Sequence, residues 1–180
     1  MSAVHLAEPD AGWPRQFEAV AEAIRSALGD QAGVIEHIGS TAVPGLCAKP
    51  VLDVLLGVPA LAAVESRVAE LAARGYRYRP AYEAELPDRR YFVRDADATL
   101  PRVHLHAVVQ GGALWCAHIG FRDALRRDAA LAQRYGQLKR ALAVQHAHDK
   151  AAYTDAKAPF IADVLARWQP PAPDVPHPPT

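Results

Sequence analysis

Polar side chains within otherwise apolar strands are the first candidates for chemistry. The run 102–106, RVHLH, alternates polar and apolar residues, and this period of two predicts a strand with Arg102, His104 and His106 on one face. Such a face is typical of a solvated cleft, and His-x-His is also a spacing at which a strand can present two imidazoles to a transition metal. Metal ligands and hydrogen-bonded structural histidines are equally good interpretations of the two imidazoles.

Asp53 is the one charged residue in the apolar run Val51–Val58, which predicts a central strand covered on both faces. Alternation along this strand places Asp53 on the same face as Leu55. A carboxylate there must be solvated, hydrogen-bonded or metal-bound, because burying it without a partner is costly. Asp53 is therefore a candidate for chemistry or metal binding, and a carboxylate held by backbone donors is the structural alternative.

The sequence Gly39-Ser40-Thr41 follows a short β-rich run, Val34–Ile38. Glycine at a strand end lets backbone N–H groups approach an anion, and the two hydroxyl groups add donors. We expect an anion site here, with Lys49 able to reach a bound phosphate, while a plain turn is the alternative. Glu36 is a minor candidate for a further carboxylate if its strand face matches that of Asp53.

Cationic residues are in excess in the second part of the chain. Residues 1–100 carry 10 Lys and Arg against 14 Asp and Glu, whereas residues 101–180 carry 10 against 6. This asymmetry predicts a wall of cations facing an anionic ligand, with two solvated faces as the alternative. The members of this wall, with one tyrosine spaced four residues from a lysine, are Arg122, Arg126, Lys139, Tyr153 and Lys157.

Hydrophobic periodicity assigns the elements that would position these side chains. Helices are predicted at 13–28, 60–74, 114–127, 129–143 and 155–168, and strands at 34–38, 51–58, 76–79, 90–93 and 102–109. The order favours one α/β domain over residues 1–169, with a mixed sheet, flanking helices and a helical C-terminal segment. Six of the 11 residues at 170–180 are proline, which predicts a disordered or polyproline-like tail.

Composition excludes several classes of protein. The chain has 20 Lys and Arg and 20 Asp and Glu, and this balance disfavours a dedicated binder of duplex nucleic acid. No apolar run approaches the roughly 18 residues of a membrane span, and the N-terminus does not resemble a secretory signal. We therefore expect a cytoplasmic protein without a membrane partner. Cys47 and Cys116 form no CxxC motif and are expected to be reduced. The sequence leaves undecided whether the protein forms a homodimer.

The long run 37–53, HIGSTAVPGLCAKPVLD, resembles the signature of the GrpB family. Four further segments share the resemblance, which extends from Trp13-Pro14 to about Trp168. They are His104-Leu105-His106, Phe121–Arg126, Leu138-Lys139 and the region from Tyr153 to Ile161. By this resemblance the chain is identified as a member of the GrpB family, which is grouped by fold with the polymerase-β-like nucleotidyltransferases.

That resemblance implies a specific site. In nucleotidyltransferases a Gly-Ser element holds nucleotide phosphates, and carboxylates on two neighbouring strands hold divalent metal ions. Gly39-Ser40 matches the first element and Asp53 matches the first carboxylate. Leu55 stands at the second carboxylate position, and His104 and His106 occupy the strand expected to carry the third. The usual magnesium site is therefore incomplete, and one Asp with two His is a softer ligand set, closer to zinc, manganese or iron.

We expect a protein that acts on, or binds, a nucleotide or another phosphorylated small molecule. The alternatives are a catalytically degenerate anion-binding module and a structural or partner-binding protein with a vestigial pocket. In an enzyme, Asp53, His104 and His106 would carry the chemistry or bind a single divalent metal, without ordinary magnesium-dependent nucleotidyl transfer. The expected ligand-binding residues are Gly39, Ser40, Thr41, Lys49, Arg102, Arg122, Lys139, Tyr153 and Lys157.

Overall fold

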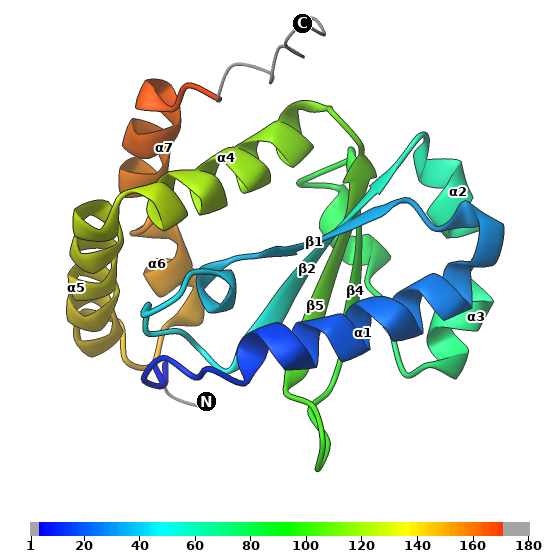
Figure 1. The fold of residues 1–180 in the computed structure, drawn as a ribbon, viewed down its shortest axis with the longest axis horizontal. Helices are drawn as coiled ribbons and strands as arrows, with labels where there is room; N and C mark the ends of the chain where they lie inside the picture. The colour runs from blue at the N-terminus through cyan, green and yellow to red at the C-terminus, as the bar shows by residue number, and fades with distance from the viewer. Residues whose placement is uncertain (1–3, 171–180) are drawn as a thin grey trace, which may run out of the picture.

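A computed structural model describes residues 4–170, which form a five-stranded mixed sheet flanked by helices (Figure 1). The strand order is β1-β2-β5-β4-β3, in which β2 and β5 are parallel and the other neighbours are antiparallel. The strands are β1 (Val34–Ile38), β2 (Val51–Val58), β3 (Arg77–Tyr78), β4 (Arg89–Arg94) and β5 (Arg102–Val109). The predicted α/β class with a mixed sheet is confirmed.

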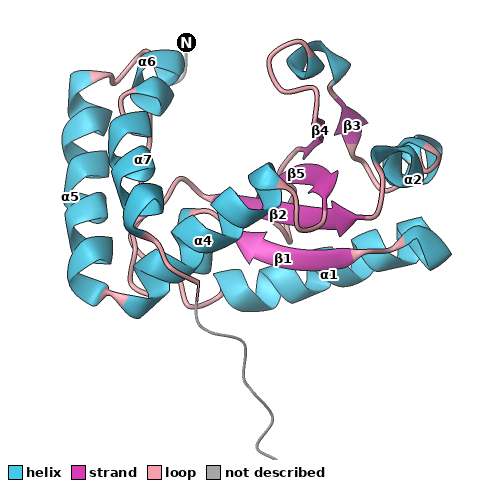
Figure 2. Cartoon of the chain, turned by 90° about the horizontal axis from the view of Figure 1, so that it is seen from above, coloured by secondary structure: helices cyan, strands magenta, loops and turns pink. Residues whose placement is uncertain are grey.

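The helices divide into those that cover the sheet and those that stand beside it (Figure 2). Their bounds are α1 (Trp13–Leu28), α2 (Leu61–Glu65), α3 (Val68–Ala73), α4 (Ala113–Arg127), α5 (Ala129–Gln145), α6 (Lys150–Asp155) and α7 (Ala158–Arg167). The last three form a separate helical layer beside one end of the sheet, and α4 connects the two parts. In the part of the chain that the structure describes, no helix has the length and apolar character needed to cross a membrane.

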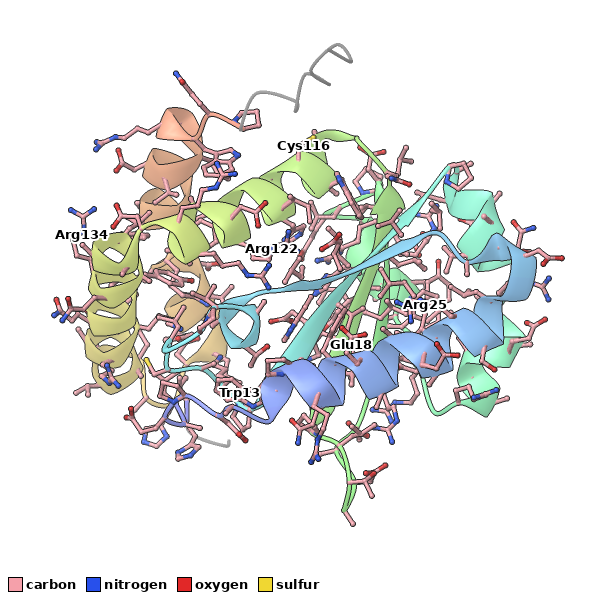
Figure 3. All side chains as sticks on the ribbon, in the orientation of Figure 1. Trp13, Glu18, Arg25, Cys116, Arg122 and Arg134 are labelled. Carbon is pink, nitrogen blue, oxygen red and sulfur yellow. The ribbon has the colours of Figure 1, made fainter. Side chains whose placement is uncertain are left out.

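One sheet face carries the main hydrophobic core, because alternate residues of β2 and β5 point into it. Leu52, Val54 and Leu105 are completely buried there against α1, α2 and α3. Helix α1 follows the amphipathic pattern: Trp13 is buried, while Glu18 and Arg25 lie on its exposed face (Figure 3). This face supplies stability and leaves the opposite face for polar side chains.

The opposite face is only partly covered by helix α4. Leu55, Ile38 and Val108 form a small apolar cluster with α4 side chains. Leu55 is completely buried, so an apolar residue at this position is explained by packing against the helix. Further along the same face lie Asp53 and the polar side chains of β5, beyond this cluster.

Two predicted helices differ from those in the structure. The predicted helix at 60–74 is interrupted between α2 and α3, where Arg67 has a non-helical ψ of 16°. The predicted helix at 155–168 begins only at Ala158 and follows a separate helix, α6. Pro159 lacks the N–H that a continuous helix would need, and it sits instead in the first turn of α7. The predicted proline-rich tail lies almost entirely outside the described residues, which end at 170.

Candidate functional site

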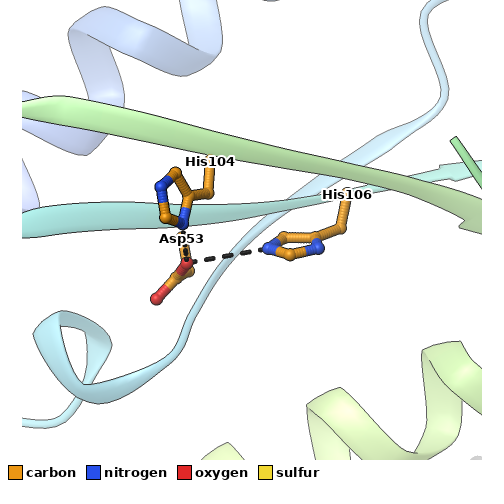
Figure 4. Close-up of side chains that lie close together, drawn as sticks. All are labelled: Asp53, His104 and His106. Atoms are coloured by element: carbon orange, nitrogen blue, oxygen red, sulfur yellow. Dashed lines mark ion pairs between the residues drawn. The ribbon is translucent and has the colours of Figure 1, made fainter. Parts of the chain in front are cut away.

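Asp53 meets both histidines because β2 and β5 are neighbouring parallel strands in register. Asp53 lies opposite His104, and the next residue on the same face, Leu55, lies opposite His106. His104 Nδ1 is 3.4 Å from Asp53 Oδ1, and His106 Nε2 is 3.6 Å from the same oxygen (Figure 4). The three side chains are half-buried, so one carboxylate oxygen is shared by two imidazoles in a partly desolvated position.

The protonation of Asp53 is decided by competition between burial and these imidazoles. Burial on its own would raise the pKa of Asp53, but hydrogen bonds from His104 and His106 hold it well below its usual range. Burial lowers the pKa of His106. Its neighbour on α4 is His118, whose ring centroid is 5.7 Å away and whose pKa is lowered to about 4 by burial. The site therefore combines an anionic carboxylate with two imidazoles, those of His106 and His118, that burial keeps neutral at neutral pH.

Two arginines contact the sides of the imidazoles that face away from Asp53 Oδ1. Arg102 Nε donates to His104 Nε2 at 3.3 Å and also forms an ion pair with Asp95 at 3.1 Å. Arg89 Nη1 lies 3.5 Å from His106 Nδ1. Arg102 was expected to bind ligand phosphate; it is instead exposed, engaged with His104, and absent from the lining of the neighbouring cavity.

A cavity of about 270 Å³ opens beside Asp53, between the sheet and the helical layer. Its walls come from distant parts of the chain: the 3-10 turn Ser40–Ala42, the loop before β2, α5 and α6. It contains most of the ligand-binding residues expected from the sequence. Its polar lining residues are Ser40, Thr41, Lys49, Asp53, His104, Lys139, Tyr153, Thr154 and Lys157. We call this space the lysine cavity.

Three lysines converge on the lysine cavity without a carboxylate partner of their own. Lys49 and Lys157 place their ammonium groups 4.3 and 4.4 Å from the centroid of the Tyr153 ring. Lys139 is buried and donates to Ser40 Oγ at 2.8 Å and to the Cys47 carbonyl. Within residues 4–170, no ion pair joins any of these three lysines to an acidic side chain.

Burial makes these ammonium groups easier to deprotonate. It lowers the pKa of Lys139 to about 8. The pKa of Lys157 is also lowered to about 8, first by burial and then by the nearby charge of Lys49. The pKa of Lys49 is lowered by burial, with a further contribution from Lys150. A bound anion would offset both the desolvation and the mutual repulsion.

Gly39 has a different role from the one expected. Its φ of +71° is in the left-handed region, and a Cβ atom there would lie 2.5 Å from Asp53 Oδ2. The space that a side chain would occupy is thus filled by the carboxylate. The glycine permits close approach of Asp53 to the backbone and is absent from the cavity lining, whereas its neighbours Ser40 and Thr41 line the cavity. The Thr41 hydroxyl is already engaged, because it contacts His37 Nε2 at 2.9 Å and donates to the Val51 carbonyl at 3.4 Å.

The two arginines of the expected cation wall lie elsewhere. Arg122 is buried and donates to Glu36 at 2.5 Å, to Asp123 at 2.8 Å and to the His37 carbonyl at 3.1 Å. Figure 3 shows Arg122 extending from α4 toward β1. Arg126 donates to the Ala42 carbonyl. Helical spacing correctly placed the two arginines on one face, but that face packs against β1 and the following turn, away from the lysine cavity.

Glu36 also has a structural partner. It lies opposite Leu55 in the antiparallel β1–β2 pair, so it shares the sheet face of Asp53 as the minor hypothesis required. Its carboxylate, however, is engaged by Arg122. Within the described chain, the one group of potential metal-ligating atoms that come together is Asp53, His104 and His106, with all three atoms within 4.8 Å of one another.

Sequence reasoning missed Arg89 and Thr154. Arg89 lies on β4, whose Tyr91 is opposite His106 and has its ring centroid 5.1 Å from that imidazole. The period-two pattern Arg89, Tyr91 was a usable signal, but the strand was predicted to begin one residue later. Thr154 lines the lysine cavity from α6, a helix that the hydrophobic pattern did not reveal.

A magnesium site of the nucleotidyltransferase type does not fit these residues. Magnesium requires hard oxygen ligands in near-octahedral geometry. Asp53 supplies one carboxylate, Leu55 is buried against α4, and imidazoles stand where further oxygen ligands would be needed.

Comparisons of sequence and of structure with known proteins identify the same family. The family model described as "GrpB protein" matches residues 3–167. The chain is 33% identical over 156 residues to "Glutamate-rich protein GrpB" of Alkalihalophilus pseudofirmus, covering 85% of this chain and 88% of that protein. It is similar to the crystal structure of conserved protein GrpB from Enterococcus faecalis, with a TM-score of 0.78, 33% identity, and coverage of 90% of this chain and 95% of that one.

A more distant similarity concerns the fold alone. The structure of Cid1 in complex with its short product ApU aligns with a TM-score of 0.52 and 11% identity. The alignment covers 73% of this chain and 41% of that one. The fold of this chain is therefore similar to that of a protein solved with a dinucleotide product.

Proposed function

The chain belongs to the GrpB family, and from that premise and the residues of the lysine cavity we propose that it binds a phosphorylated small molecule. The phosphate occupies the lysine cavity, where Lys49, Lys139 and Lys157 surround it and Ser40 donates a hydroxyl hydrogen bond. The observation that carries this proposal is the convergence of three lysines that have no carboxylate partner in the described chain.

Holding three ammonium groups together in a partly desolvated space is unfavourable. Lys139 is almost completely buried, and Lys49 and Lys157 share one aromatic ring, so their charges repel each other. Cation–π contacts offset this by about 0.5–2 kcal/mol each, which is less than a bound dianion would contribute. A site that holds three desolvated cations is electrostatically complementary to a phosphate group.

Nucleotides are the first compounds to test. Cid1, whose fold is similar over 73% of this chain, was solved with "its short product ApU". Two relatives of 31% and 26% identity are named dephospho-CoA kinase, and the match covers 46% of each of them. These names describe those proteins. For this chain they serve only to decide which ligands are tested first.

A second candidate function is catalysis on the same ligand. Asp53 and His104 line the lysine cavity, so an anionic carboxylate and an imidazole would face a bound phosphate compound. Because the magnesium ligands are incomplete, such catalysis would use the imidazole as an acid or base. It is tested by incubating the bound ligand with the protein and measuring product formation, with His104→Asn as the variant.

Binding is tested by thermal shift and isothermal titration calorimetry with nucleoside mono-, di- and triphosphates, inorganic tripolyphosphate and sulfate. A ligand at a hundred times its Kd should stabilise the fold by about 2.7 kcal/mol. Lys139→Met should weaken binding about 10-fold or more, because a charge-assisted hydrogen bond is lost. The matched control is Arg134→Met, since Arg134 projects outward from the same helix (Figure 3).

Either of two results would overturn the proposal. One is the absence of stabilisation by every phosphate compound in the panel. The other is binding that Lys139→Met and Arg134→Met weaken equally, because a general loss of positive charge would then account for it.

A further inference from the structure

Two arginines contact the ring nitrogens of His104 and His106 that face away from Asp53. We infer that Asp53, His104 and His106 form a metal-free cluster in which Arg89 and Arg102 fix both imidazoles as donors to Asp53. This inference goes beyond the proposed function, because it stands on the contacts of the sheet residues alone.

The tautomer of His106 follows from its contact with Arg89. A guanidinium group can only donate hydrogen bonds. Arg89 Nη1 approaches His106 Nδ1 at 3.5 Å, so Nδ1 must present its lone pair there. In a neutral imidazole the proton is then on Nε2, the atom that lies 3.6 Å from Asp53 Oδ1.

His104 repeats this arrangement with its nitrogens exchanged. Arg102 Nε donates to His104 Nε2 at 3.3 Å, so the lone pair is on Nε2. The proton is therefore on Nδ1, which lies 3.4 Å from the same oxygen of Asp53. Two independent arginines thus direct two N–H groups of opposite tautomers toward one carboxylate oxygen.

A metal ion would need the reverse arrangement. A metal-binding imidazole gives its lone pair to the ion and donates its other N–H to an acceptor such as a carboxylate or a carbonyl. Here the outer nitrogens face two guanidinium groups, so a metal at Asp53 would leave N–H groups directed at N–H donors and bring a third cation close to Arg89 and Arg102. The atoms that could ligate are close together, but their surroundings oppose an ion.

In the cluster both imidazoles approach Oδ1 of Asp53, and Oδ2 has no imidazole contact within the described residues. Oδ1 is shared by the imidazoles, while Oδ2 lies beside Gly39, and Asp53 lines the lysine cavity. A metal-free carboxylate in this position accepts a hydrogen bond from a ligand hydroxyl or amine and repels a phosphate. The ligand class that fits both halves of the site is a phosphate ester carrying a hydroxyl group.

Nuclear magnetic resonance tests the tautomers directly. Long-range ¹H–¹⁵N spectra of the full chain in EDTA should show His104 protonated on Nδ1 and His106 protonated on Nε2. Arg102→Met should remove the preference at His104 alone, and Arg89→Met should remove it at His106 alone. A wild-type spectrum with either histidine in the other tautomer would overturn the inference.

Metal binding gives a second, independent readout. Equilibrium dialysis against Zn²⁺ or Mn²⁺ should show no Asp53-dependent binding in the wild type. The double variant Arg89→Met/Arg102→Met should gain measurable Zn²⁺ binding, and adding Asp53→Asn should abolish this gain. Wild-type binding of either ion that disappears in Asp53→Asn would contradict the inference, whether or not the double variant folds.

The effect of Asp53→Asn on tripolyphosphate binding has opposite signs for a metal-free cluster and for a cluster that holds a metal ion. Without a metal, Asp53→Asn removes a negative charge near the lysines and should strengthen tripolyphosphate binding by about 5-fold. If a metal linked Asp53 to the phosphate, the same substitution would weaken binding. If tripolyphosphate does not bind at all, the proposed function fails, and the tautomers still decide the present inference.

Discussion

Raising the pH from 7 to 9 should release a phosphate ligand from the lysine cavity. The pKa values of Lys139 and Lys157 are both lowered to about 8, chiefly by burial. Each lysine is therefore about 0.9 protonated at pH 7 and about 0.1 protonated at pH 9. If binding requires one of them to be charged, affinity falls about 10-fold, and if it requires both, it falls about 100-fold. Lysines with ordinary pKa values near 10.5 would give almost no change over this range.

The loss of binding should not reflect unfolding. The folded-state pKa of each lysine is below its unfolded value, so the unfolded chain binds more protons between about pH 8 and pH 10.5. The contribution of these groups to stability therefore rises with pH across that window. Binding and stability should change in opposite directions as these two lysines lose their protons.

The assay is calorimetric titration of tripolyphosphate at pH 7, 8 and 9 and constant ionic strength, with thermal melts of the free protein at each pH. Lys157→Met should bind more weakly at pH 7 and retain only the single-lysine, about 10-fold, pH dependence. Titrations in buffers of different ionisation enthalpy should show proton uptake on binding at pH 8. Equal affinity at pH 7 and pH 9, or a loss that parallels a falling melting temperature, would refute the reasoning.

Three further predictions concern the residues around the site. Gly39→Ala should destabilise the fold by at least about 1 kcal/mol more than Gly45→Ala in urea unfolding, because both glycines have positive φ but only the Cβ at position 39 would collide with Asp53; equal losses would contradict this. Burial lowers the pKa of His37 to about 4, so the wild type should lose about 2 kcal/mol between pH 7 and pH 5 through this group, and His37→Gln should lose that much less. Arg122→Met should cost about 1–3 kcal/mol, because Glu36 and Asp123 are only partly buried and water can replace part of the lost hydrogen bonding. The same substitution should change tripolyphosphate affinity less than 3-fold, and a loss as large as that of Lys139→Met would show that Arg122 belongs to the anion site.

The sheet chemistry could be predicted because a strand has a simple period. Alternation alone placed Asp53 on one face of its strand and His104 and His106 on one face of theirs, and the family resemblance supplied the expectation that the two strands are neighbours. The apolar residue at position 55 was also recognised from that resemblance. Its physical reason, burial against α4, required the structure.

The positions of the residues in the cation wall were predicted less accurately than those of the polar side chains on the strands. Helical spacing shows which residues share a face of one helix, but it carries no information about which surface that face meets. Lys139 and Arg122 therefore looked equivalent in the sequence, although one lines the lysine cavity and the other supports β1. Hydrophobic periodicity predicted a helix from 155, whereas α7 begins at Ala158, with Pro159 in its first turn, and the preceding helix α6 was not predicted.

Tyr153 brings two positive charges together where the helical layer meets the loop before β2. The ammonium groups of Lys49, from the loop before β2, and of Lys157, at the start of α7, both lie close to the Tyr153 ring, and the charge of Asp53 offsets part of their repulsion. In thermodynamic terms, the repulsion between them is a cost that the free protein carries and the bound protein does not. An anion would therefore couple the helical layer to the sheet, and its binding energy would appear as slower local opening of α6 and α7. Occupancy of the cavity and rigidity of the C-terminal helices would then be two measures of the same equilibrium.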